Sequence, residues 1–271
     1  MRIILEQVTK NYGNVQGISN ISLDIGKGIT GILGPNGAGK STTMKMILGL
    51  SKPSRGRVTV DGKNPFFDYD FKRNFGFVPE YDAFYEHMTG AEFVTYFLRM
   101  HDIDKNKSET MAREALIELG LEEAMNRKIN TYSRGMRQKT KVARATIFNP
   151  KILIMDEPSS ALSKNEASVL FDVIKELTNQ GVTIIYISHK LEEIMQIGDV
   201  ITVLRDSKFI CEEKISKIDI PWITEQMVGK RSFEAVNNTK TNIGSKVIEA
   251  KSINLKTVSY THLTLPTKRI V

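Results

Sequence analysis

The sequence predicts an α/β fold in which a mixed or parallel sheet is flanked by helices. Residues 151–156 form a continuous apolar run that ends in acids, which is typical of a buried central strand. A helical segment at 164–179 and a second apolar strand at 183–187 follow, so these segments predict a βαβ unit. A glycine-rich loop at 34–42 lies between a predicted strand and a predicted helix. These observations together favour helices packed on a largely parallel sheet.

The other elements of the first 80 residues follow from apolar alternation, apolar runs and turn residues. We expect strands at 3–8, 18–25, 28–33, 58–60 and 75–78, and a helix at 42–50. The turn Asp61-Gly62 ends the strand at 58–60.

From residue 89 to residue 148 the chain becomes helical in character. Phe93, Tyr96 and Phe97 repeat at helical spacing, and such a stripe is more typical of core packing than of a ligand site. Beyond the βαβ unit we expect a hairpin at 199–204 and 209–212 and a helix at 222–228. A helical block is therefore inserted into the α/β order.

Composition excludes several classes of protein. No apolar run approaches the roughly 18 residues of a membrane span. The single cysteine, Cys211, excludes an internal disulfide framework and fits a reducing cytosol. The formal net charge is +7, but the lysines and arginines are spread along the chain, so a solvated basic surface is expected rather than a nucleic-acid tract.

The glycine-rich loop fits the pattern G-x-x-x-x-G-K-[ST], which wraps the phosphates of a nucleotide. Its glycines let backbone N–H groups face anionic oxygens, and the following helix adds its N-terminal dipole. Lys40 is expected to reach the β- and γ-phosphates, and the Ser41 hydroxyl to help hold Mg²⁺. The predicted phosphate-binding residues are Gly34, Pro35, Asn36, Gly37, Ala38, Gly39, Lys40, Ser41 and Thr42.

Asp156-Glu157, at the end of the apolar strand, predicts the second half of this site. Asp156 is expected to hold Mg²⁺, largely through water, and Glu157 to polarise the water that attacks the γ-phosphate. A charged strand end before Pro158 is the alternative interpretation, and the phosphate-binding loop upstream favours the site.

A further motif reads Tyr132-Ser133-Arg134-Gly135-Met136-Arg137-Gln138. It resembles the L-S-G-G-Q signature of ATP-binding cassette (ABC) ATPases, with Arg134 in place of the usual Gly and Met136 in place of the usual Gln. Its position, after a helical block and before the acids, is the family order. The resemblance implies that Ser133, Arg134, Gly135 and Met136 reach the γ-phosphate bound by a partner cassette in a head-to-tail dimer. Without the family, Ser133 is a helix N-cap.

The resemblance implies four more assignments. His189 resembles the switch histidine that contacts the γ-phosphate, and Tyr12 the aromatic residue that stacks on adenine. Glu80 stands where most members carry a glutamine that touches Mg²⁺, and Ser163 where many have an aspartate linking the two sites. Viewed alone, His189 and Tyr12 are a structural histidine and a tyrosine beside a turn.

The fold that the resemblance implies is a P-loop NTPase core with an N-terminal antiparallel β subdomain and an inserted helical subdomain at about 86–148. A nucleotide-binding domain at 1–231 would bind and hydrolyse ATP with Mg²⁺ and power a separate integral-membrane permease. It would pair with a second nucleotide-binding domain, as a homodimer or tandem partner, at the cytoplasmic face of the membrane, with no nucleic acid expected. The alternatives are a soluble ABC-type ATPase acting on ribosomes or DNA, and a chimeric fragment without transport activity.

Two halves of the chain resemble different relatives. Residues 1–150 are similar to ATPases of ABC-2-type exporters, whereas residues 159–256 are similar to the tandem ATPases of ribose-type sugar importers. We hypothesise a chimera joined at 152–158; a natural, divergent cassette is the alternative. Long-read DNA sequencing across codons 145–165 separates the two, since an unbroken gene in independent isolates contradicts a chimera.

The end of the chain carries three expectations of its own. Residues 232–245 are expected to be a linker and 246–257 the start of a truncated second cassette. Residues 258–271 resemble a translated sequencing adapter and are expected to be a non-native tail.

Overall fold

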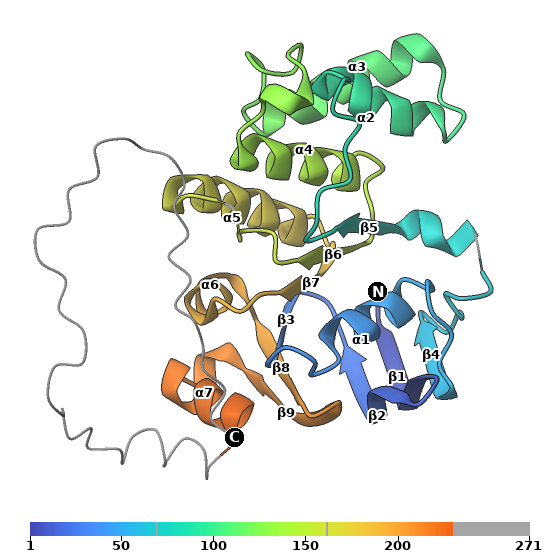
Figure 1. The fold of residues 1–271 in the computed structure, drawn as a ribbon, viewed down its shortest axis with the longest axis vertical. Coiled ribbons are helices and arrows are strands. Elements are labelled where there is room, and N and C mark those ends of the chain that lie inside the picture. The colour runs from blue at the N-terminus through green and yellow to red at the C-terminus, as the bar shows by residue number, and fades with distance from the viewer. Residues whose placement is uncertain (69, 161, 230–271) are drawn as a thin grey trace, which may run out of the picture.

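The computed structural model describes residues 1–68, 70–160 and 162–229 (Figure 1). The expected linker, second-cassette start and non-native tail, at 232–245, 246–257 and 258–271, lie outside the described residues. No helix in the described ranges is long and apolar enough to cross a membrane.

An antiparallel sheet occupies the N-terminal part, as expected. Its strand order is β2-β1-β4, where β1 is Ile3–Tyr12, β2 is Val15–Ile25 and β4 is Arg55–Val60. Ile3 lies opposite Ile25 on one side and Val60 on the other. The first two strands extend beyond their predicted ends because they meet in a tight turn, in which Gly13 has a φ of 58°.

The larger sheet has six strands in the order β5-β6-β7-β3-β8-β9. The strands are β3 (Ile29–Leu33), β5 (Phe75–Val78), β6 (Ile152–Asp156), β7 (Thr183–Ile187), β8 (Val200–Arg205) and β9 (Lys208–Lys214). All neighbouring pairs are parallel except β8 with β9, the predicted hairpin. The sheet is therefore mixed, which confirms the predicted fold class.

Every residue of β3, β6 and β7 is buried, because both faces of this sheet are covered. Along β6, Leu153 and Met155 join one core cluster with the helical block, whereas Ile152 and Ile154 join a second with the antiparallel sheet. Because successive side chains of a strand point to opposite faces of the sheet, one apolar run contributes to two hydrophobic cores.

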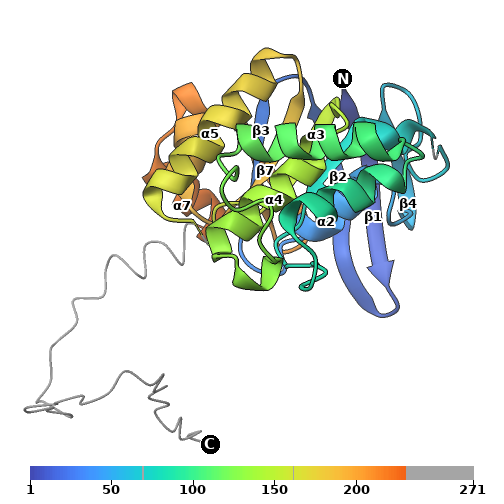
Figure 2. The same cartoon turned by 90° about the horizontal axis from the view of Figure 1, so that it is seen from above.

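One group of helices forms the inserted block (Figures 1 and 2). The inserted block contains α2 (Gly90–Arg99), α3 (Lys105–Glu118) and α4 (Arg134–Thr146), which pack on one another beside α5 (Lys164–Asn179). The remaining helices are α1 (Lys40–Ile47), α6 (Leu191–Ile197) and α7 (Ile220–Val228), and short 3₁₀ turns occur at Asp70–Asn74, Ile129–Thr131 and Ile215–Lys217.

Two helix predictions need correction, and one helix was missed. The helix predicted at 42–50 begins at Lys40, directly after Gly39 with a φ of 101°, and ends before Gly49, whose φ of 65° terminates it. The helix predicted at 222–228 begins two residues earlier, since Asp219 caps it through the Trp222 N–H at 2.9 Å. Helix α6 was not predicted, because its 7 residues are too few to show a period.

Candidate nucleotide site

The glycine-rich loop joins β3 to α1 in a conformation that requires glycine. Gly34 has a φ of 154°, and a Cβ there would lie 2.2 Å from the carbonyl oxygen of Leu204. Gly39 has a φ of 101°, and a Cβ there would lie 2.5 Å from Cγ2 of Ile18. The loop is therefore seated against β8 on one side and β2 on the other, which fixes its path to the helix start.

Lys40 is held by the loop that it follows. Its Nζ donates to the carbonyl oxygens of Gly34 at 2.7 Å and Pro35 at 3.1 Å. Burial lowers the pKa of Lys40, while the carboxylates of Glu157, Asp156 and Glu80 act in the opposite direction. A partly desolvated ammonium group close to carboxylates is thus poised at the start of α1.

A cavity of about 760 Å³ collects the predicted residues from separate parts of the chain. The carboxyl ends of β3, β6 and β7 meet at this edge of the sheet, where α/β proteins bind ligands (Figure 1). The predicted residues in its wall are Tyr12, Asn36, Gly37, Ala38, Gly39, Lys40, Ser41, Thr42, Glu80, Asp156, Glu157 and His189. Gly34 and Pro35 support the loop and do not line this cavity.

Four residues of the wall were missed in the sequence analysis: Val15, Gln16, Gly17 and Ser160. Gly17 allows close packing, because a Cβ there would lie 2.9 Å from Cε2 of the Tyr12 ring. Tyr12 is 44% exposed and Val15 68%, although both are large apolar residues. An exposed Val beside an aromatic residue in a polar turn is the signal that could have identified this part of the wall.

Asp156 is a buried carboxylate that shares the cavity with two others. Its side chain lies at the end of β6, and burial raises its pKa to about 6, with the charges of Glu80 and Glu157 adding to the effect. Lys40 opposes the shift. Ionising Asp156 in the nucleotide-free site therefore costs more free energy than ionising a solvent-exposed aspartate.

This pKa leads to a stability prediction. Because the pKa of Asp156 is higher in the folded chain than in the unfolded one, its stabilising contribution is complete below about pH 4 and is lost as the pH rises through about 6. We expect Asp156→Asn to stabilise the nucleotide-free protein in EDTA by roughly 2 kcal/mol at pH 8. At pH 4 the gain should vanish. Urea denaturation at both pH values measures it.

The control for this prediction is Asp172→Asn, which removes an exposed carboxylate from α5. It should leave the free energy of unfolding nearly unchanged at either pH. An Asp156→Asn gain that is equal at pH 8 and pH 4 would contradict the raised pKa.

Glu157 adopts a backbone conformation that is unusual for a residue with a side chain. Its φ is 48°, and its N–H donates to the Ile187 carbonyl at 2.9 Å, which ties the ends of β6 and β7 together. Strained backbone of this kind occurs where a site positions a functional side chain. The carboxylate is mostly buried and points to the edge of the sheet shared with His189.

Glu157 Oε2 lies 2.7 Å from His189 Nδ1, which is ion-pair distance. Within the described residues this oxygen accepts no hydrogen bond of good geometry, so the contact with His189 is one of proximity. His189 itself is exposed, at 66% of its side chain, and lines the cavity. The pair thus combines a buried carboxylate with an accessible imidazole.

The signature residues lie elsewhere in the same chain. Ser133 caps α4 by accepting from the Met136 N–H at 3.2 Å, Ser133 and Arg134 are exposed, and none of the four signature residues lines the cavity. Gly135 is buried beside α5, where an added Cβ would lie 2.0 Å from Glu166 Oε1. The fold therefore does not bring Ser133, Arg134, Gly135 and Met136 to this chain's own phosphate-binding loop.

Ser163 has a local role. It caps α5 in a capping box, with its N–H donating to Glu166 Oε2 at 2.9 Å. The hydroxyl therefore performs a helix-capping function at the position where the resemblance expects an aspartate.

Two basic residues of α4 bind the segment that carries Glu80. Lys141 Nζ donates to the carbonyl oxygens of Pro79 and Glu80 at 3.1 and 3.2 Å and lies 3.1 Å from Asp82 Oδ1. Arg137 makes a two-pronged contact with Glu86, at 2.6 and 2.7 Å. The backbone at Glu80 is thus fixed to the helix that begins with the signature.

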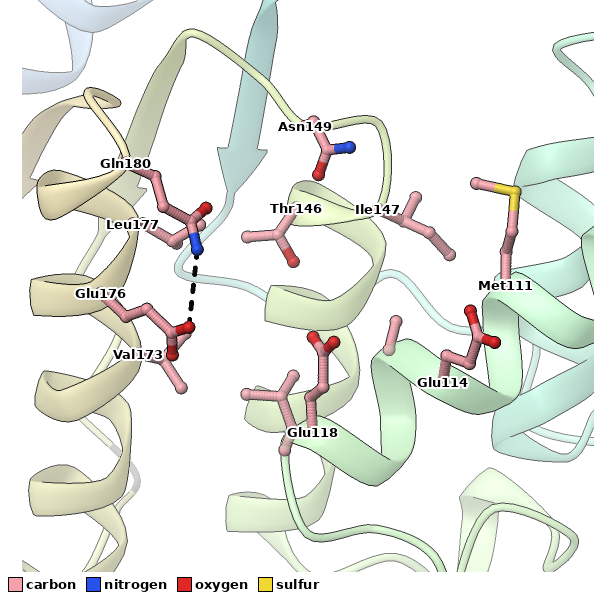
Figure 3. Close-up of a pocket in the computed structure, with 12 residues that line it drawn as sticks. Met111, Glu114, Glu118, Thr146, Ile147, Asn149, Val173, Glu176, Leu177 and Gln180 are labelled. Atoms are coloured by element: carbon pink, nitrogen blue, oxygen red, sulfur yellow. Dashed lines mark hydrogen bonds between the residues drawn. The ribbon is translucent and has the colours of Figure 1, made fainter.

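A second cavity, of about 460 Å³, lies between α3 and the C-terminal parts of α4 and α5 (Figure 3). Its wall combines Glu114, Glu118 and Glu176 with apolar side chains, and Gln180 donates to Glu176 at 3.5 Å. No predicted site residue lines it.

Comparison with known proteins agrees with this geometry. Residues 18–160 match the protein-family model described as "ABC transporter". The chain is 33% identical to the ribose import ATP-binding protein RbsA of Bacillus licheniformis over 266 residues, 95% of this chain and 54% of that protein. It is 33% identical to the galactose/methyl galactoside import ATP-binding protein MglA of Clostridium perfringens over 233 residues, 83% of this chain and 45% of that protein.

The chain spans about half the length of these curated relatives. The alignment with RbsA extends over the residues before and after the hypothesised junction at 152–158. It does not test whether the two halves come from different genes, so the chimera hypothesis stays a prediction.

Solved structures show the same fold. The dimeric structure of the bacterial ABC transporter cassette MJ0796 is 29% identical, with a TM-score of 0.71 over 79% of this chain and 98% of that one. The same cassette in a post-hydrolysis state, bound to ADP and Pi, is 28% identical with the same TM-score. The family match covers more than half of the chain, and the fold and cavity agree with it, so this chain belongs to the ABC transporter family.

Proposed function

We propose that this chain binds and hydrolyses ATP as the nucleotide-binding part of an ABC transporter. One observation carries the proposal: the cavity at the edge of the larger sheet unites the phosphate-binding loop with Asp156, Glu157 and His189. A regulator that only binds nucleotide has no need of a strained carboxylate paired with a histidine. The solved cassette with ADP and Pi supports hydrolysis as the activity of this fold.

In the proposed reaction, backbone N–H groups of the loop and the Lys40 ammonium bind the phosphates. Glu157 accepts a proton from a water molecule as the water oxygen bonds to the γ-phosphorus, and the bond from that phosphorus to the bridging oxygen breaks. ADP and inorganic phosphate leave. His189, beside Glu157, orients the attacking water and contacts the γ-phosphate.

The oxygen donors in the wall fit a magnesium ion. Ser41, Asp156 and Glu80 all line the cavity, and a hard cation takes hydroxyl and carboxylate oxygens. Among the described residues no group of three or more His, Cys, Asp or Glu side chains forms a metal site by itself, so phosphate oxygens and water would complete the shell. Bound Mg²⁺ supplies charge neutralisation at the phosphates and at Asp156.

The proposal includes a second cassette. Ser133 and Gly135 lie outside their own chain's cavity, and Ser133 with the first turn of α4 offers a hydroxyl and N–H groups to an anion. A head-to-tail partner would bring these groups to the γ-phosphate of the opposite site. The dimeric MJ0796 structure supports such a pairing.

The transported substrate is inferred from the relatives. RbsA is named for ribose import and MglA for galactose and methyl galactoside import. We therefore assign this chain to sugar import, at the cytoplasmic face of the membrane and in partnership with a separate permease. No observation favours action on ribosomes or DNA.

Reconstitution tests the proposed function. The full chain is combined with the permease encoded next to its gene and placed in proteoliposomes, with a Lys40→Ala chain as control. We expect ATP hydrolysis that needs Lys40 and uptake of a pentose or hexose that needs ATP. Efflux through a neighbouring export-type permease would contradict import, and cofractionation with ribosomes would favour the soluble alternative.

A further inference from the structure

A buried polar cluster joins the turn that carries Glu157 to the turn that carries His189. Its centre is Glu193, in the first turn of α6, whose side chain is only 12% exposed. Glu193 Oε2 accepts hydrogen bonds from Ser159 Oγ and, at 2.9 Å, from the Tyr186 hydroxyl. Lys190 Nζ lies 3.1 Å from the other carboxylate oxygen.

Lys190 closes the cluster by a second contact. Its Nζ donates to the Ser159 carbonyl at 2.9 Å, so Ser159 is bound through both its side chain and its backbone. Ser159 and Tyr186 are fully buried. Burial raises the pKa of Tyr186, which keeps its phenol protonated as a donor. Hence the buried carboxylate has a partner for each oxygen.

The position of the cluster links it to the chemistry. Ser159 lies two residues after Glu157, and Lys190 directly follows His189. The backbone around Glu157 is strained, and such a conformation persists only when its surroundings hold it. The cluster connects the two turns on the side away from solvent, where Tyr186, the fourth of the five residues of β7, is fully buried.

A contribution to folding stability does not by itself explain why the carboxylate of Glu193 is buried. An acid in the first turn of a helix is favourable at the surface, as Glu192 shows by remaining exposed in the same turn. Glu193 instead buries its charge, and a buried ion pair contributes little net stability compared with an apolar residue of similar volume. The buried carboxylate instead fixes the positions of Ser159, Tyr186 and Lys190 relative to one another.

We infer that Glu193 is a positioning residue that keeps the side chains of Glu157 and His189 in the relative position needed for ATP hydrolysis. The inference rests on the proposed function. It assigns to α6 a role in aligning the two reacting side chains, through Ser159 on one side and Lys190 on the other.

Steady-state kinetics of the full chain test the inference. Glu193→Ala should lower kcat by about ten- to a hundred-fold, because a displacement of about 1 Å between reacting groups costs this much. The KM for ATP and the affinity for a non-hydrolysable ATP analogue should stay unchanged, since the phosphate-binding loop is intact. Glu193→Gln, which keeps an acceptor for Ser159 and Tyr186, should recover part of the rate. Glu192→Ala is the matched control.

A double mutant separates positioning from a general structural role. If Glu193 acts through the pair, Glu193→Ala should change the single-turnover rate little in a His189→Ala background. An equal fold-loss in both backgrounds overturns the inference, as does a kcat that Glu193→Ala leaves unchanged.

If Glu193→Ala does not fold, Ser159→Ala and Tyr186→Phe each remove one donor and should lower kcat in the same way. Unchanged kcat in both of these variants would equally overturn it. If the wild-type chain has no ATPase activity, the proposed function itself fails. If the wild-type chain is active and the variants keep its kcat, only the positioning role of Glu193 fails.

Discussion

Glu157→Gln should retain ATP binding and lose nearly all turnover. The amide has the size of the carboxylate, so the strained turn and the contact with His189 can form, but it cannot accept a proton from the attacking water. General bases accelerate a reaction by about 10²- to 10⁴-fold, and we expect kcat to decrease by a factor in that range. Phosphate release measures turnover, and a fluorescent ATP analogue measures binding.

The matched control is Glu192→Gln, which makes the same chemical change on the exposed face of α6. It should hydrolyse ATP at the wild-type rate. Unchanged hydrolysis in Glu157→Gln would overturn the assignment of Glu157, whereas loss of ATP binding in that variant would mean that the carboxylate supports the loop instead of the reaction.

Lys40→Ala should abolish most ATP binding. The Lys40 ammonium donates to two carbonyl oxygens of the loop and is partly desolvated, so it is placed to exchange these partners for phosphate oxygens. Hydrogen bonds to charged groups contribute about 1.5–3 kcal/mol, which corresponds to roughly a ten- to hundred-fold weaker Kd. Titration calorimetry with MgATP measures the change.

Lys52→Ala removes the same charge from an exposed position outside the cavity and should bind ATP almost as wild type does. Circular dichroism of both variants checks that α1 is intact. A Kd that Lys40→Ala leaves unchanged would show that the backbone N–H groups bind the phosphates without the lysine.

The fold could be predicted where one local pattern settles an element. The apolar run at β6, the period of α5 and the hairpin of β8 and β9 are each visible in consecutive residues. Helix α6 could not be predicted, because a seven-residue helix has too few turns to show its buried face. Packing of Ile194 and Ile197 into the core, a tertiary contact, stabilises that helix.

The residues of the candidate site also fall into those that the sequence could predict and those that it could not. Motif spacing alone pointed to Lys40, Asp156 and Glu157, whereas the resemblance was needed for His189 and Tyr12. Val15 was missed because it belongs to no motif, and Ser160 because the motif around it pointed only to Ser163. Both reach the wall through the folding of neighbouring turns. The roles proposed for the residues that were predicted, such as Lys40 and Glu157, stay predictions.

The sequence by itself determined which chemistry we propose for this protein. A glycine-rich loop can be identified from consecutive residues, because the positive φ of Gly34 and Gly39 is a local requirement. The tertiary structure alone decided which groups meet. The strand order β6-β7-β3 places Glu157 2.7 Å from His189, although many residues of chain separate them, and brings both beside Lys40. Glu193 gains its partners in the same way, since distances between remote segments depend on how the sheet is ordered and packed.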